Sequence, residues 1–383
     1  MTVTAPAGFE AAGVAAGLTA GGAPDVALVV NRGPHPSAAA VFTTNRAKAN
    51  PVLWSERAVA DGTVTAVVLN SGGANCFTGP KGFQTTHATA ERVAVALDSS
   101  AADVLVCSTG LIGDQLDAER LLGGVDAAVA ALSPDGGADA ATAIITTDTH
   151  PKTAAITRDG WTIGGMAKGA GMLAPALATM LVVITTDAAL PAPALDAALR
   201  GAVRASFDRL DSDGCTSTND TVALLASGAS GLTPSAADFA EALSELCLDL
   251  ARQLQRDAEG SSHDIDVRVT GAASVEDAVE VGRAVARSNL FKTAVYGNDP
   301  NWGRVLAAIG TTRAAFDPYA VDVSMNGVRI CTAGGQDRPR DEVDLTPRQV
   351  DVLVELGVGA HEATIMTNDL THAYVHENSA YSS

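Results

Sequence analysis

Thr179 lies where the sequence changes from a flexible loop to a buried strand. The residues before it are small, and Gly169, Gly171 and Pro175 among them are typical of a loop. After Thr179 the chain continues as Met-Leu-Val-Val-Ile-Thr-Thr, an apolar, β-branched run that predicts a strand in the core. A threonine hydroxyl held by rigid backbone can act as the nucleophile of acyl transfer when a base lies beside it. Thr179 is therefore the candidate nucleophile, with Lys168 at the start of the loop.

A second candidate is the loop that follows the apolar run 104–107. It reads Ser108-Thr109-Gly110, a hydroxyl next to a glycine amide. These two donors can converge on one developing negative oxygen, which is the chemistry of an oxyanion hole. Such triplets are also common in ordinary turns, and the residues alone favour the turn.

Two further polar positions follow apolar segments. Thr146 and Thr147 begin the cluster Thr-Thr-Asp-Thr after the run 143–145, where a strand edge with a turn is the plain alternative. Glu259 comes at the end of a predicted helix, where a solvated side chain is the plain alternative.

The elements that would position these residues alternate between strands and helices, which predicts an α/β protein. Short β-rich runs predict strands at 26–30, 40–44, 51–54, 65–69, 104–107, 264–270, 362–367 and 370–375. Helical spacing and start signals predict helices at 82–97, 117–132 and 191–207, a helix that begins at Thr233 and ends before Glu259, and another through Ile309.

Composition excludes several classes of function. The 383 residues carry 25 Lys and Arg against 44 Asp and Glu, a net charge of −19, which opposes binding to nucleic acid or to anionic lipid. The five cysteines form no Cys-x-x-Cys pair, and the seven histidines show no ligand spacing, so no metal site is expected. Gly164 to Gly169 has the spacing of a phosphate loop, but Ala170 stands where that loop needs lysine. Without a signal segment or an apolar run of membrane-spanning length, we expect a cytoplasmic protein.

Several motifs together resemble one known family. The run Lys168-Gly-Ala-Gly-Met172, then Pro175, then Ala178-Thr-Met-Leu181, is similar to the self-cleavage segment of the ornithine acetyltransferase (glutamate N-acetyltransferase) family of arginine biosynthesis. The segments 146–149, 213–221 and Asp299-Pro-Asn-Trp-Gly-Arg304 match further motifs of that family in the same order. The sequence departs from the family at Gly73, which replaces asparagine, and at 261–263, where Ser-Ser-His replaces Ala-Thr-Lys and removes a positive charge.

The resemblance implies a precursor that cuts itself between Ala178 and Thr179. The products would be an α chain, 1–178, and a β chain, 179–383, folded as layered sheets and helices like the amino-terminal-nucleophile hydrolases. Thr179 would be the nucleophile, and Thr109 with Gly110 would form the oxyanion hole. The residues implied in substrate binding are Thr146 or Thr147, Lys168, Thr179, Glu259, Asn378 and Ser383.

The implied reaction moves acetyl from N2-acetylornithine to glutamate through an acetyl-threonine, by a ping-pong mechanism that regenerates N-acetylglutamate. No cofactor is implied, although acetyl-CoA could serve as a second donor, and the expected assembly is a heterotetramer of two α and two β chains. Two alternatives remain open. A self-cleaved amidase or aminopeptidase would pass the acyl group to water, and a non-catalytic amino-acid-binding relative would keep the loops without the cut.

Overall fold

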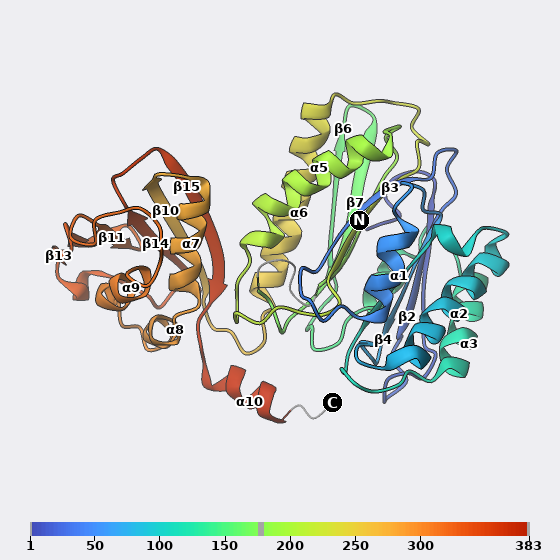
Figure 1. Cartoon of the computed structure of the whole chain (residues 1–383), viewed down its shortest axis with the longest axis horizontal. Helices are drawn as coiled ribbons and strands as arrows, with labels where there is room; N and C mark the ends of the chain where they lie inside the picture. The colour runs from blue at the N-terminus through green and yellow to red at the C-terminus, as the bar shows by residue number, and fades with distance from the viewer. Residues whose placement is uncertain (1, 175–179, 381–383) are drawn as a thin grey trace.

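The computed structural model describes residues 2–174 and 180–380. It consists of a four-layered sandwich of helices and sheets and a smaller C-terminal lobe (Figure 1). The prediction of an α/β fold with layered sheets and helices is therefore confirmed. Among the described residues, no helix is long and apolar enough to cross a membrane.

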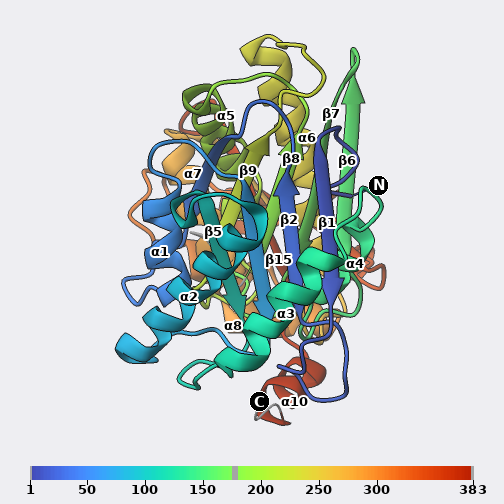
Figure 2. The same cartoon turned by 90° about the vertical axis from the view of Figure 1, so that its right-hand side faces the viewer.

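One sheet of the sandwich has the strand order β1-β2-β4-β5, in which only β4 and β5 run parallel. Helices α2 and α3 cover its outer face (Figure 2). Its predicted strands at 26–30, 65–69 and 104–107 are confirmed within one or two residues. The bounds are β1 (Phe9–Val14), β2 (Val26–Asn31), β4 (Ala66–Ser71), β5 (Val104–Thr109), α2 (Gly79–Leu97) and α3 (Ala118–Ala130).

The second sheet has the order β3-β9-β8-β7-β6, and helices α5 and α6 cover its outer face. In β8, the strand predicted after Thr179, every residue is buried, because the strand lies between two packed layers. Its neighbours are β7, which precedes position 179, and β9, which follows it. The bounds are β3 (Ser37–Phe42), β6 (Lys152–Arg158), β7 (Trp161–Lys168), β8 (Leu181–Thr186), β9 (Thr221–Ala226), α5 (Ala192–Ala205) and α6 (Ala236–Arg256).

The strand predicted at 51–54 is wrong, because this segment lies in helix α1 (Asn50–Ala58). Pro51 occupies the first helical turn, where its missing N–H costs nothing, and Val52, Ser55 and Ala58 are buried on one side. A short apolar run does not distinguish a helix from a strand. The apolar run at 143–145 begins at the last residue of a short helix, α4 (Gly137–Ala143), which packs on β1.

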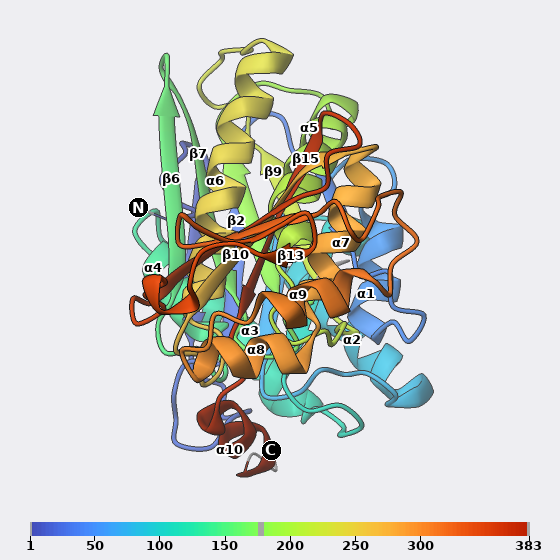
Figure 3. The same cartoon turned by 90° about the vertical axis from the view of Figure 1, so that its left-hand side faces the viewer.

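The C-terminal lobe contains a six-stranded sheet of order β13-β12-β11-β14-β10-β15, packed on helices α7 to α9 (Figure 3). Asn301 caps α9, because its side chain accepts a hydrogen bond from the N–H of Arg304. The bounds are β10 (Asp264–Ala272), β11 (Asp322–Met325), β12 (Val328–Thr332), β13 (Gly335–Gln336), β14 (Gln349–Glu355), β15 (His361–Asn368), α7 (Val275–Ala286), α8 (Asn289–Tyr296) and α9 (Trp302–Ile309).

The chain leaves the lobe after β15 and ends in helix α10 (His372–Ala380), which extends below the seam between lobe and sandwich (Figure 1). The strand predicted at 370–375 is therefore wrong. The hydroxyl of Thr371 accepts a hydrogen bond from the N–H of Tyr374 at 2.9 Å, which starts a helix here. This helix brings Asn378 toward the sandwich.

Candidate active site

The loop after β5 holds Thr109 and Gly110 in a fixed orientation. The carbonyl of Thr109 accepts a hydrogen bond from the N–H of Gly73 at 2.9 Å. Because the peptide is planar and trans, the N–H of Gly110 points the opposite way. Gly110 has a φ of 125°, and a Cβ there would lie 2.5 Å from the nitrogen of Gly73. Only glycine fits this position. Gly73 helps to orient the Thr109–Gly110 peptide through its hydrogen bond to the carbonyl of Thr109.

Lys168 is fully buried at the end of β7, and its ammonium contacts the hydroxyls of two predicted site residues. Nζ donates to Oγ1 of Thr109 at 3.2 Å and to Oγ1 of Thr146 at 2.8 Å. When the oxygen of Thr109 accepts from Lys168, its own O–H is available to donate to another oxygen. Thr109 is thereby prepared as a donor.

The charge of Lys168 is supported by a buried network around Asp148. Oδ1 of Asp148 accepts from Nζ of Lys152 and from the N–H of Gly169, both at 2.6 Å, and Oδ2 lies 3.7 Å from Nζ of Lys168. Lys152 also donates to Asp257. The network therefore joins two lysines to two carboxylates, and all four side chains are buried.

Electrostatics within this network oppose the effect of burial. Burial raises the pKa of Asp148, but the charges of Lys168 and Lys152 and their hydrogen bonds outweigh it and lower the pKa to about 2. Burial lowers the pKa of Lys168, while the carboxylates of Asp148 and Glu259 raise it. Removal of Asp148 would therefore lower the pKa of Lys168 further.

The loop 213–221 links the oxyanion loop to the start of β8. Nδ2 of Asn219 donates to the carbonyl of Ser108 at 2.8 Å, and Oδ1 of the adjacent Asp220 accepts from the N–H of Met180 at 3.1 Å. Burial raises the pKa of Asp220 well above its usual value. These contacts connect the loop to both the oxyanion loop and the start of β8. In the part of the chain described, no group of His, Cys, Asp and Glu could hold a metal ion.

Glu259 lies in a cavity of about 400 Å³ that the C-terminal helix closes on one side. Oε1 of Glu259 accepts from the hydroxyl of Thr147 at 2.7 Å, and Oε2 accepts from Nδ2 of Asn378 at 3.0 Å. A Cβ on Gly171 would lie 2.5 Å from Oε2 of Glu259, so the glycine-rich loop makes room for this carboxylate. The cavity is lined by Thr147, Glu259, His376, Glu377, Asn378 and Ala380.

The structure gathers the predicted site residues into two adjoining groups. Thr109, Gly110, Thr146 and Lys168 form one group, and the carboxylate of Glu259 in the other attracts Lys168. Ala178, Thr179 and Ser383 lie outside the described residues. The strand after Thr179 nevertheless begins beside the first group, because Leu181 pairs with Lys168.

The residues that support Lys168 were not predicted from the sequence. Asp148 and Lys152 belong to the motif around the predicted threonines, and Asp257 precedes Glu259 by two positions. Their spacing gives no sign that all three side chains are buried together. An aspartate and a lysine four positions apart would normally indicate a surface pair.

His263, the last residue of the segment 261–263 that departs from the family motif, is buried beside Asp369. Nδ1 of His263 lies 2.8 Å from Oδ2 of Asp369, and Nε2 lies 3.0 Å from the carbonyl of Leu345. The side chain of His263 therefore packs on the buried carboxylate of Asp369.

Comparison with known proteins identifies the family. The profile of the ArgJ family matches residues 10–383. The chain belongs to the ArgJ family. Two relatives named arginine biosynthesis bifunctional protein ArgJ are 63% identical over 383 residues, from Streptomyces avermitilis, and 56% identical over 389 residues, from Mycobacterium tuberculosis. The matches cover all of this chain and 100% and 96% of those relatives.

Solved structures of ArgJ-type proteins also match. One is the crystal structure of ornithine acetyltransferase complexed with ornithine from Mycobacterium tuberculosis. It is 55% identical and covers 47% of this chain and 96% of its own, with a TM-score of 0.45. Membership in the ArgJ family rests on the sequence matches over the full length.

Proposed function

We propose that this ArgJ-family chain is a cytoplasmic glutamate N-acetyltransferase that moves acetyl from N2-acetylornithine to glutamate. The observation that carries the proposal is the hydrogen bond from Lys168 to Thr109, beside the first residue pair of β8. It prepares the hydroxyl of Thr109 as a donor beside the start of the strand that follows the predicted nucleophile. The ornithine complex of the Mycobacterium tuberculosis relative supports ornithine as part of the donor.

Self-cleavage would create the base that the reaction needs. In the precursor, the hydroxyl of Thr179 attacks the carbonyl of Ala178, and water hydrolyses the resulting ester. The α-amine that is released has a pKa of about 7.7 to 8 in general, so it accepts a proton at neutral pH far more readily than lysine, with a pKa of about 10.4. The cut thus converts a weak hydroxyl into an activated nucleophile.

In the first half-reaction, Oγ1 of Thr179 attacks the acetyl carbonyl of N2-acetylornithine while the α-amine takes its proton. The oxygen of the tetrahedral intermediate receives hydrogen bonds from the hydroxyl of Thr109 and the N–H of Gly110. The bond between carbon and nitrogen breaks, the proton passes to the departing amine, and ornithine leaves. In the second half-reaction the amine of glutamate attacks the acetyl ester and restores Thr179.

The cavity at Glu259 supplies contacts for the amino-acid parts of the substrates. The carboxylate of Glu259 would bind a substrate ammonium, and Lys168, with Asn378 and Ser383 of the C-terminal segment, would bind carboxylates. Of the two threonines, Thr147 lines this cavity, whereas the hydroxyl of Thr146 accepts from Lys168. We therefore assign the substrate contact to Thr147.

The proposal extends to assembly and to a second donor. Two α and two β chains would give a particle of about twice 38.6 kDa, which light scattering would measure. Acetyl-CoA would acylate the same Thr179 and leave the glutamate half-reaction unchanged. An assay with acetyl-CoA and glutamate alone tests that second activity directly.

Steady-state kinetics and mass spectrometry test the main reaction. Because one site serves both amino acids in turn, double-reciprocal plots for N2-acetylornithine against glutamate should be parallel. Donor alone should add one acetyl group to the 179–383 fragment. Intersecting lines with no acetylated fragment would refute the covalent route through Thr179.

The acceptor distinguishes the alternatives. A transferase should release ornithine much faster with glutamate than without it, because the acetyl ester is protected from water. Equal rates would favour the amidase alternative. An intact, uncut chain that binds ornithine without turnover would favour the non-catalytic alternative.

A further inference from the structure

We propose that the cavity between the sandwich and helix α7 binds a small molecule through an oxyanion, a phosphate or carboxylate group, held between Arg209 and Arg283. No residue of the candidate active site lines this cavity. The proposal therefore does not rest on the acetyl transfer.

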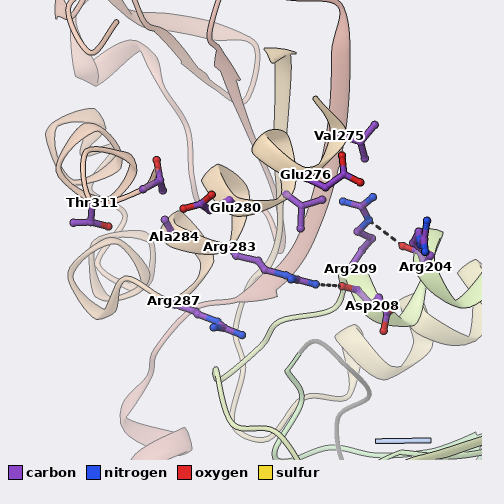
Figure 4. A pocket seen from close by; sticks show the side chains of 12 residues that line it. Arg204, Asp208, Arg209, Val275, Glu276, Glu280, Arg283, Ala284, Arg287 and Thr311 are labelled. Carbon is purple, nitrogen blue, oxygen red and sulfur yellow. Dashed lines mark hydrogen bonds between the residues drawn. The ribbon is translucent and has the colours of Figure 1, made fainter. Parts of the chain in front are cut away.

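The cavity has a volume of about 500 Å³, a size typical of small-molecule sites. One wall comes from the end of α5 and from the short helix η2 (Phe207–Arg209) of the sandwich, and the other from α7 of the lobe (Figure 4). The charged residues of its lining are Arg204, Arg209, Arg283 and Arg287 with Asp208, Glu276 and Glu280.

The charge of this lining differs from that of the protein. Four arginines face three carboxylates here, whereas the whole chain has a net charge of −19. Arg287 forms an ion pair with Asp211, a residue outside the lining, at 2.8 Å. With Arg287 paired, three arginines and three carboxylates remain in the lining, so the cavity does not share the strong negative charge of the whole chain.

Arg209 and Arg283 retain donors that the described residues do not satisfy. Nε of Arg209 donates to the carbonyl of Arg204 at 3.0 Å, and Nη2 of Arg283 donates to the carbonyl of Asp208 at 2.9 Å (Figure 4). In the described part of the chain, Nη1 of Arg209 and Nε of Arg283 are buried without a hydrogen-bond partner. Buried donors of a charged group that lack partners are unfavourable.

The two guanidinium groups also repel each other. Burial lowers the pKa of Arg209, and the nearby charge of Arg283 lowers it further. Burial lowers the pKa of Arg283 as well, with a contribution from Arg287. An oxyanion between the two would accept hydrogen bonds from both planar forks and would neutralise the repulsion.

Such a ligand would join the two parts of the molecule. Arg209 belongs to the sandwich and Arg283 to the lobe, so one oxyanion would bridge them. Arg287 also lines a second cavity of about 300 Å³, which contains Glu259 and Lys292. Arg287 therefore separates the proposed oxyanion site from a cavity that also contains Glu259.

Isothermal titration of the full-length protein with inorganic phosphate, pyrophosphate and citrate, at constant ionic strength set with chloride, tests the proposal. At least one probe should bind saturably and should raise the melting temperature, since it binds only the folded state. Preference for pyrophosphate would indicate a phosphorylated ligand, and preference for citrate a carboxylate. Absence of saturable binding for all three would overturn the proposal.

Variants locate the binding. Arg209→Gln and Arg283→Gln should each weaken the best probe roughly ten- to a hundredfold, the range for a lost hydrogen bond to a charged group. Arg268→Gln is the matched control, because Arg268 pairs with Glu362 on the surface of β10 and should leave affinity unchanged. Equal affinity in all three variants would mean that the ion binds adventitiously elsewhere.

A gain of affinity provides a test that does not depend on removing an arginine. Glu276 lines the cavity and attracts Arg209, so it competes with the anion. Glu276→Gln should tighten binding roughly threefold to tenfold at low salt, where a nearby charge is weakly screened. Unchanged or weaker binding in this variant would contradict a site at Arg209.

Discussion

The ammonium of Lys168 donates a hydrogen bond to the hydroxyl oxygen of Thr109 at 3.2 Å, and both residues are buried. The positive charge of Lys168 acts on the hydroxyl of Thr109. It fixes the acceptor side of the hydroxyl and increases the tendency of its O–H to donate. The consequences can be measured one residue at a time.

Removal of the Thr109 hydroxyl should lower kcat. With Thr109→Ala one donor to the developing oxyanion is lost, which for such donors costs about 10² to 10³ in kcat. Thr109→Ser keeps the hydroxyl and is the control. A Thr109→Ala variant with normal kcat and a raised KM would show that Thr109 acts in binding only.

Lys168→Met should lower kcat through Thr109, and it should also raise KM if Lys168 binds a substrate carboxylate. The double variant with Thr109→Ala separates the two effects. If Lys168 acts on kcat only through Thr109, the two losses in kcat should not add. Additive losses would mean that Lys168 assists catalysis independently of Thr109.

Asp148→Asn should shift the pH dependence of kcat. Lys168 is charged below its pKa, and the facing groups are Asp148, Lys152 and Glu259. Loss of the Asp148 carboxylate lowers the pKa of Lys168, so the ammonium loses its proton at a lower pH than in the unmodified protein. The alkaline limb of the kcat profile should therefore shift to lower pH. Asp196→Asn, a surface residue paired with Arg200, is the control. An unchanged alkaline limb with a uniformly lower kcat would indicate a structural role alone.

The cut between Ala178 and Thr179 should be visible by intact mass. The purified protein should give two chains, 1–178 and 179–383, whereas Thr179→Ala should remain a single chain. Thr179→Ser should still cut, more slowly, because a hydroxyl is retained. Full activity in a preparation that contains only uncut chain would refute the self-cleavage mechanism.

Glu259→Gln should weaken substrate binding. Thr147 and Asn378 hold this carboxylate in place, and loss of its charge should raise KM for N2-acetylornithine roughly ten- to a hundredfold. Glu377→Gln, on the same cavity but exposed, is the matched control. An equal rise of KM in both variants would point to a general charge effect.

Periodicity and residue type predicted much of the fold. The apolar, β-branched run of β8 predicts a strand, and the leucines on one face of α6 predict a helix, because each pattern matches one kind of element. The segment 51–54 does not, because the choice of helix depends on the buried face of α1, which a four-residue window does not reveal. The segment 370–375 was likewise predicted as a strand because its pattern does not reveal the cap at Thr371, which starts a helix there.

The site was predictable in its residue types rather than in its contacts. Motif resemblance selected Thr109, Lys168 and Glu259, and the structure brings them into adjoining groups. The sequence could not show that Asp148, Lys152 and Asp257 share one buried network, since burial is set by the packing of segments more than a hundred residues apart. The roles of Thr179 and Ser383 stay predictions.

Sheet β3-β9-β8-β7-β6 takes its strands from both sides of position 179. Strand β8 is hydrogen-bonded to β7 before that position and to β9 after it, so a cut there divides the sheet between two polypeptides. Folding must then come before cutting, while the connection still makes strand pairing intramolecular. Afterwards the mature protein would lose that advantage each time it unfolds, because its two chains would have to meet again by diffusion. Recovery after denaturation should then depend on protein concentration for the cut form and not for the uncut Thr179→Ala chain.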